Sequence, residues 1–126
     1  MAKRLLDTSI LIRQWLLERR MTRRRAVALA KELIQLKGTN VIASPVVIEF
    51  LAGTRNRAEL EFARLFLNEF EVADQQAIPA RDWEQAQRLA QRVPRDGKPR
   101  HLGDCLIRAI AHRLHYDVET LDDRFV

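Results

Sequence analysis

Short runs with apolar residues alternate with longer amphipathic segments along the chain, and this alternation constrains the fold most strongly. Four short runs, at residues 3–6, 40–43, 71–73 and 118–121, have the length of strands. Apolar residues recur at helical spacing over residues 10–17, 24–37, 44–53, 58–70, 79–93 and 102–114. Strands that alternate with helices usually form a parallel sheet covered by helices on both faces. The pattern therefore predicts an α/β fold with a short parallel central sheet.

Local signals predict several helix ends and core positions. Gly38 is expected to end the helix that precedes it. Ser44 and Pro45 predict a helix start, because a serine oxygen can cap a free backbone amide and proline tolerates the first helical position. Trp15 and Trp83 fall on apolar helix faces, so both are predicted to pack in the core rather than stack on bases.

The length and cysteine content indicate an ordinary single-domain protein. With 126 residues, the chain has the size of one domain, and a single domain over residues 1–126 is expected. The single cysteine, Cys105, cannot form an internal disulfide and is expected to be a small buried hydrophobe, which fits a reducing cytoplasm. Asp7 and Arg13 interrupt the N-terminal apolar run, so it resembles neither a signal peptide nor a membrane span. We therefore expect a cytoplasmic location and no membrane.

The positive charge of the chain is concentrated near its N-terminus. The formal net charge is +5, with an isoelectric point near 10.1. Residues 1–25 contain eight basic and two acidic residues, a net +6, so the remaining residues carry about −1. A basic surface of this kind attracts polyanions, of which nucleic acid is the commonest. A solvated helix face explains the charge equally well.

Four acidic residues lie among neighbours that are expected to be buried: Asp7, Glu49, Asp104 and Asp122. Acidic side chains are rarely buried in full unless they are paired or bind a metal. Asp7 and Asp122 follow predicted strands, and ligands of α/β sheets bind at the carboxyl ends of the strands. Glu49 lies one turn inside a predicted helix, and Asp104 lies in the first turn of another. Each acid also has an ordinary explanation: a helix cap, a rim position, a partner of the helix dipole or a turn former.

A cluster of these acids would need a positive partner. Each pair of carboxylates about 4 Å apart repels by roughly 4 kcal/mol at an intermediate effective dielectric. Protonation or a divalent cation relieves this repulsion, and oxygen ligands with one thiol and few histidines favour Mg²⁺ or Mn²⁺ over zinc. Mg²⁺ keeps several waters when it binds carboxylates, so it can orient a hydroxide toward a phosphate. The acids therefore predict phosphodiester cleavage.

The sequence around the four acids resembles a known family. The segments Leu-Leu-Asp-Thr-Ser-Ile-Leu-Ile, Ser-Pro-Val-Val-Ile-Glu-Phe-Leu-Ala-Gly, Leu-Gly-Asp-Cys-Leu-Ile-Arg-Ala-Ile-Ala and Val-Glu-Thr-Leu-Asp-Asp-Arg-Phe look like the four signature blocks of PIN domains, in order. The chain resembles in particular the VapC-type toxins of type II toxin–antitoxin systems. This resemblance implies a PIN-like three-layer sandwich and a homodimeric Mg²⁺-dependent endoribonuclease. It also implies a small antitoxin whose tail occupies the acidic groove.

The resemblance also implies roles for particular residues. The metal-binding and catalytic residues would be Asp7, Glu49, Asp104 and Asp122, supported by the hydroxyl groups of Ser9 and Thr120. Asp123 is adjacent to Asp122 and could share or take the fourth position.

Two residues before the third block are candidates for binding the substrate. Arg100 could steer RNA toward the metal, and His101 could contact a phosphate or carry a proton. A polar loop end is the simpler explanation for both residues.

Two functions of other classes remain open. One is a basic module that binds nucleic acid or a partner helix without cleaving it. The other is a domain that accepts a phosphoryl group on an aspartate at a strand end. The phosphatase pattern needs a second acid two residues after the first, and this chain has Ser9 there.

Overall fold

A computed structural model of the protein describes residues 3–92 and 100–121, and the structural statements below refer to them. Each segment that the sequence predicts to be a strand or a helix forms that kind of element, with ends that differ by a few residues. The described elements are, in chain order, β1 (Lys3–Leu6), α1 (Thr8–Trp15), α2 (Arg23–Lys37), β2 (Val41–Ile42), α3 (Ser44–Ala52), α4 (Arg57–Leu67), β3 (Glu71–Val72), α5 (Ala80–Ala90), α6 (Leu102–Leu114) and β4 (Tyr116–Glu119).

The strands form two short parallel pairs. β1 pairs with β4, with Leu6 opposite Glu119, and β2 pairs with β3, with Ile42 opposite Val72. β1 also contacts β2, so the two pairs lie side by side. Between them, the hydroxyl group of Thr39 donates a hydrogen bond of 2.7 Å to the carbonyl oxygen of Arg4. The predicted α/β class with short parallel strands is confirmed.

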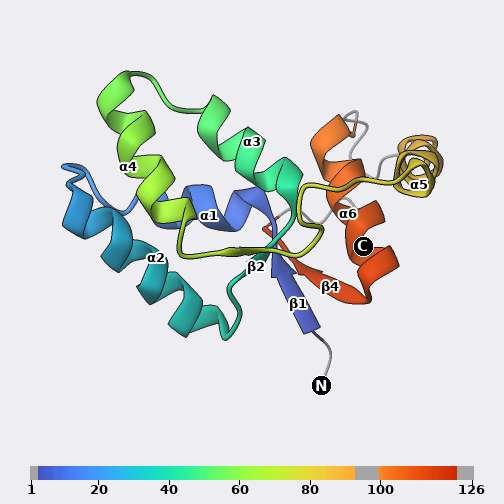
Figure 1. The fold of residues 1–126 in the computed structure, drawn as a ribbon, viewed down its shortest axis with the longest axis horizontal. Helices are drawn as coiled ribbons and strands as arrows, with labels where there is room; N and C mark the ends of the chain where they lie inside the picture. The colour runs from blue at the N-terminus through green and yellow to red at the C-terminus, as the bar shows by residue number, and fades with distance from the viewer. Residues whose placement is uncertain (1–2, 93–99, 122–126) are drawn as a thin grey trace.

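Helices lie on both sides of these strands. Figure 1 shows α1 to α4 on one side, in blue to green, and α5 and α6 on the other, in yellow to red. The main core lies between the strands, α1 to α4 and one face of α6, whereas a smaller cluster lies between α5 and α6 and includes the buried Cys105. No helix within the described ranges is long and apolar enough to cross a membrane.

An aromatic cluster fixes the packing of α1, α3 and α4. The rings of Phe50 and Phe66 are stacked with centroids 5.1 Å apart, and Trp15 meets each of them edge-on at 5.3 Å. Edge-to-face and offset stacked rings pack favourably because of their charge distribution. The prediction that Trp15 packs in the core is confirmed.

The prediction that Trp83 packs in the core is wrong, because its side chain is 44% exposed. The buried face of α5 consists of Asp82, Ala86 and Leu89. Nε of Arg113 on α6 lies 2.8 and 2.9 Å from the two carboxylate oxygens of Asp82. This ion pair holds Asp82 toward the interior, so the adjacent residue Trp83 points toward solvent.

The two predicted helix ends have different outcomes. α2 ends at Gly38, which has a left-handed conformation with φ of 69°, as the sequence predicts. The prediction that the Ser44 oxygen caps α3 is wrong, because Ala43 holds the cap position and makes no side-chain cap bond. The amide and hydroxyl groups of Ser44 both donate to the carboxylate of Asp74, a buried residue just after β3. The carboxylate of Asp74 therefore satisfies the free amide at the start of α3, and it also binds the hydroxyl group that was expected to act as the cap.

Candidate active site

Asp7 lies where β1 ends and α1 begins, and it serves both elements. Its amide donates a 2.9 Å hydrogen bond to the carbonyl oxygen of Glu119, which extends the pairing of β1 with β4. Its carboxylate oxygen Oδ1 accepts a 2.8 Å bond from the amide of Thr8 and so caps α1. The residue is only 2% exposed. The position at a strand end and the role as a helix cap are both confirmed.

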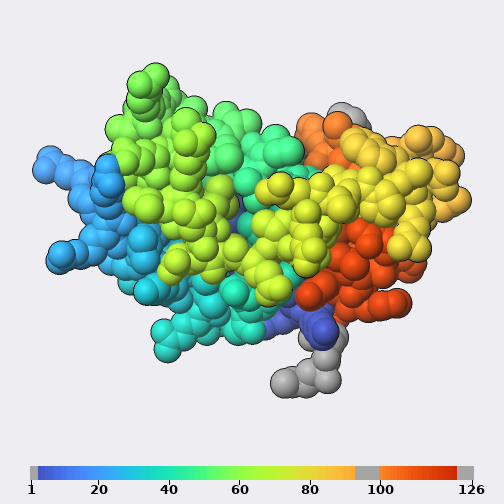
Figure 2. All heavy atoms as spheres, in the orientation of Figure 1, coloured from blue at the N-terminus to red at the C-terminus, as the bar shows by residue number. Residues whose placement is uncertain are grey.

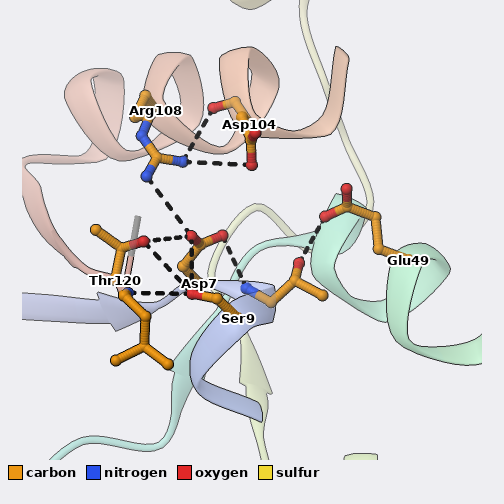
Figure 3. Close-up of polar contacts among 8 residues, drawn as sticks. Asp7, Ser9, Glu49, Asp104, Arg108 and Thr120 are labelled. Carbon is orange, nitrogen blue, oxygen red and sulfur yellow. Dashed lines mark hydrogen bonds and ion pairs between the residues drawn. The ribbon is translucent and has the colours of Figure 1, made fainter. Parts of the chain in front are cut away.

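Two hydroxyl groups orient the other oxygen of Asp7 (Figure 3). Oγ1 of Thr120 donates to Oδ2 at 2.6 Å, and Oγ of Ser9 donates to the same atom at 3.3 Å. The amide of Leu121 donates to Oγ of Ser9 at 3.1 Å. Thr120 reaches Asp7 because the parallel pairing of β1 and β4 brings the carboxyl ends of the two strands together. Ser9 and Thr120 therefore both contact Asp7, and their role as supports of a metal site, which the family resemblance implies, stays a prediction.

Glu49 approaches the same place from α3. Its Oε1 accepts a 2.5 Å hydrogen bond from Oγ1 of Thr8. Burial raises the pKa of Glu49, and the negative charges of Asp104 and Asp7 raise it further. The hydrogen bond from Thr8 and the charge of His101 act in the opposite direction. The three acids are thus close enough to influence one another.

Gly103, in the first turn of α6, lets this helix approach Glu49 closely. A Cβ atom at residue 103 would lie 2.2 Å from Oε2 of Glu49, well inside van der Waals contact. The carboxylate of Glu49 therefore occupies the space that any other residue would fill at position 103. The residue next along the chain is Asp104, so the close approach brings the carboxyl-bearing turns of α3 and α6 together.

Arg108 is a site residue that reasoning from the sequence missed. It lies on α6, and its side chain is 10% exposed. Nη2 is 3.6 Å from Oδ2 of Asp7, and Nη1 is 3.9 Å from Oδ1 of Asp104 (Figure 3). The spacing of four residues after Asp104 was a usable signal, because residues i and i+4 of a helix are neighbours.

The structure brings together most of the predicted site residues. Asp7, Glu49 and Asp104 converge at the carboxyl end of β1, and their assignment as metal ligands stays a prediction. The candidates for the fourth acid, Asp122 and Asp123, lie outside the described residues.

The two predicted substrate-binding residues have different surroundings. His101 is exposed at the cap position before α6 and influences the charge state of Glu49. The guanidinium group of Arg100 donates to the carbonyl oxygen of Arg92.

The donor atoms of the site fit a hard divalent cation. Asp7, Glu49 and Asp104 offer carboxylate oxygens, the type of ligand that Mg²⁺ and Mn²⁺ prefer. Within the part of the chain that the structure describes, no three acidic, histidine or cysteine side chains form a ready-made metal centre. The guanidinium group of Arg108 lies between two of the three carboxylates (Figure 3). A dication bound to these oxygens would orient water and neutralise charge on a phosphate.

A groove of about 510 Å³ runs beside α1, α3 and the start of α4. Glu49 lines this groove together with the basic residues Arg19 and Arg55. Its apolar lining includes Ile12 and Leu16, which are exposed at 42% and 72%. Glu49 is therefore the acid that connects the site to a groove with both apolar and charged walls.

The protein is an α/β domain with paired parallel strands between helices and acids at the carboxyl end of β1. Domains of this class bind their ligands at the carboxyl ends of the strands. The family model of the PIN domain matches residues 4–126, and the chain belongs to the PIN domain family. PIN domains are in general metal-dependent nucleases, which agrees with the acids found here. None of the curated proteins compared with the chain matches it.

Proposed function

We propose that this protein is an Mg²⁺- or Mn²⁺-dependent endoribonuclease, and that it is the toxin of a toxin–antitoxin pair. The observation that carries the proposal is the convergence of Asp7, Glu49 and Asp104 at the carboxyl end of β1 in a PIN domain. Acids from three separate segments that lie this close together repel one another and lower stability. Such a local cost is expected mainly at functional sites.

The residues would divide the work as follows. The three described acids would hold the cation, with Asp122 or Asp123 as a fourth ligand. Ser9 and Thr120 would fix the orientation of Asp7 through the hydrogen bonds described above. A carboxylate that cannot rotate keeps its ligand geometry through the reaction and avoids a reorganisation cost.

RNA would be held by the basic residues near the N-terminus. The segment between α1 and α2, in light blue, projects at the left edge of the molecule in Figure 2. Arg19, Arg20, Arg23 and Arg24 in and after this segment are exposed. Arg19 also lines the groove that leads to Glu49. Arginines along such a path would bind the phosphate backbone and make binding weaker at high salt.

A small antitoxin would bind in the same groove. The exposed Ile12 and Leu16 fit the apolar face of a partner helix, and the acids Glu18, Glu49 and Glu59 of the lining fit basic side chains on its tail. The product of a small neighbouring reading frame should co-purify with this protein and inhibit it. A homodimer is part of the proposal through the family resemblance, and sedimentation measures it directly.

The proposal is tested by incubating purified protein with RNA and with DNA of the same sequence. We expect cleavage of RNA in Mg²⁺ or Mn²⁺ and none in EDTA. The alternative of a basic binding module predicts a different result: RNA is bound with the same affinity with or without EDTA and is never cut. Cleavage of the DNA at the same rate as the RNA would refute the assignment to RNA.

A further inference from the structure

Arg108 places a positive charge where a metal is expected to bind. Its guanidinium group faces carboxylates of two different elements, Asp7 at the end of β1 and Asp104 in the first turn of α6 (Figure 3). The arginine side chain is 10% exposed, and the side chain of Asp7 is 3% exposed. Opposite charges that water reaches so poorly interact more strongly than surface pairs do.

The contacts of Arg108 with the carboxylates are nevertheless long. The distances of 3.6 and 3.9 Å exceed the roughly 2.7–2.9 Å of a charge-assisted hydrogen bond. Farther along α6, Arg113 approaches Asp82 at 2.8 and 2.9 Å and is held firmly. Nη1 of Arg108 also donates a 3.3 Å hydrogen bond to the main-chain carbonyl oxygen of Asp104. Arg108 therefore stays anchored to its own helix and compensates the charge of the two carboxylates through longer ion pairs.

A divalent cation would bind the carboxylates of the same two residues. Mg²⁺ binds oxygen at about 2.0–2.1 Å. A cation bound to Oδ2 of Asp7 or Oδ1 of Asp104 would lie within a few ångströms of the guanidinium group. Two positive charges at that separation repel strongly in a site that is mostly shielded from water.

We infer that Arg108 is a resident counterion that competes with the divalent cation for Asp7 and Asp104 and withdraws when the cation binds. It holds the acids together in the metal-free protein and lowers the affinity of the site for metal. The inference rests on the proposed function, since it requires a metal at these acids.

The test measures Mn²⁺ binding rather than cleavage. Arg108→Met removes the charge and keeps an apolar stem, so we expect Mn²⁺ to bind about tenfold more tightly, which corresponds to about 1.4 kcal/mol. Electron paramagnetic resonance of free Mn²⁺ gives the dissociation constant. The metal-free variant should melt at a lower temperature than the metal-free wild type. Saturating Mn²⁺ should raise the melting temperature of the variant by more than it raises that of the wild type.

Two further variants serve as controls. Arg108→Lys keeps one positive charge, so its Mn²⁺ affinity should stay within about twofold of the wild type. Arg113→Met breaks the firm ion pair on the same helix, so it should lower the melting temperature equally with and without Mn²⁺ and leave the dissociation constant unchanged. If metal-free Arg108→Met is unfolded, refolding on addition of Mn²⁺ supports the inference.

The outcomes separate this inference from the proposed function. If Arg108→Met binds Mn²⁺ no more tightly than the wild type, while Asp104→Asn loses binding, the competition is refuted and the metal site stands. If the wild type does not bind Mn²⁺ at all, the metal site and the competition are both wrong.

Discussion

Replacing Gly103 by alanine should separate the activity of this protein from its stability. The added methyl group would lie 2.2 Å from Oε2 of Glu49, whereas ordinary contact begins at 3.4 Å. The carboxylate must therefore move back by about 1 Å. Because it is the end of a flexible side chain, it can do so without disturbing the backbone, although its 2.5 Å hydrogen bond from Thr8 would be strained.

The expected change in stability is small. Alanine is favoured over glycine within a helix by up to about 1 kcal/mol, and residue 103 lies in the first turn of α6, where the gain is smaller. Displacement of Glu49 offsets part of this gain. The free energy of unfolding should therefore stay within about 1 kcal/mol of the wild type.

The expected change in activity is large. Misplacement of a reacting group by about 1 Å can lower a rate by about a hundredfold. We therefore expect kcat/KM for RNA cleavage in Mg²⁺ to fall by that order in Gly103→Ala, with a melting temperature that changes by no more than about 5 °C. Gly53→Ala is the matched control, because its added methyl group would lie 3.6 Å from its nearest neighbour, the carbonyl oxygen of Phe50. Full activity of Gly103→Ala would refute the argument that the position of Glu49 matters.

Three further predictions concern stability. Asp82→Ala leaves the charge of Arg113 without its buried partner and should cost about 3–5 kcal/mol in urea unfolding; a loss below about 1 kcal/mol would contradict the importance of this pair. Thr120→Val removes a hydrogen bond to the buried carboxylate of Asp7 and should cost about 1.5–3 kcal/mol, whereas unchanged unfolding would mean that the bond contributes nothing. Burial raises the pKa of Glu49 above its usual 4.5, so the folded state holds this proton more tightly than the unfolded state. The stability contributed by this proton is lost as the pH rises through the raised pKa, and in EDTA Glu49→Gln should melt higher than the wild type above that pKa. If the melting temperatures of the two proteins change in the same way with pH across this range, the raised pKa of Glu49 is refuted.

The alternation of strands and helices was sufficient to predict the fold class, because each element carries its own local signal. Asp7 illustrates this best, since the end of an apolar run and the start of a helical pattern both place it at a strand end. Periodicity alone did not predict that α3 packs against α6. The closeness of Glu49 to Gly103 depends on packing between distant segments, and only the family resemblance implied that these two blocks meet.

The errors have the same origin. Trp83 was predicted to be buried from the pattern of α5 alone, but the rotation of that helix follows the ion pair between Asp82 and Arg113. Ser44 has the local features of a cap, yet Asp74 binds it from a segment thirty residues away. Arg108 was not singled out from the sequence, because the sequence does not show that Asp7 lies opposite it.

The replacement of Asp104 by asparagine tests the central claim most directly. Asp104 is preferable to Asp7 for this purpose, because Asp7 also caps α1 and its replacement would alter the fold. The amide keeps the shape of the carboxylate and removes its charge, so the melting temperature should change little. The account predicts that Mg²⁺-dependent cleavage of RNA falls by more than about a hundredfold, beyond the loss seen when a residue merely supports a metal ligand. Cleavage at the wild-type rate by folded Asp104→Asn would contradict the account.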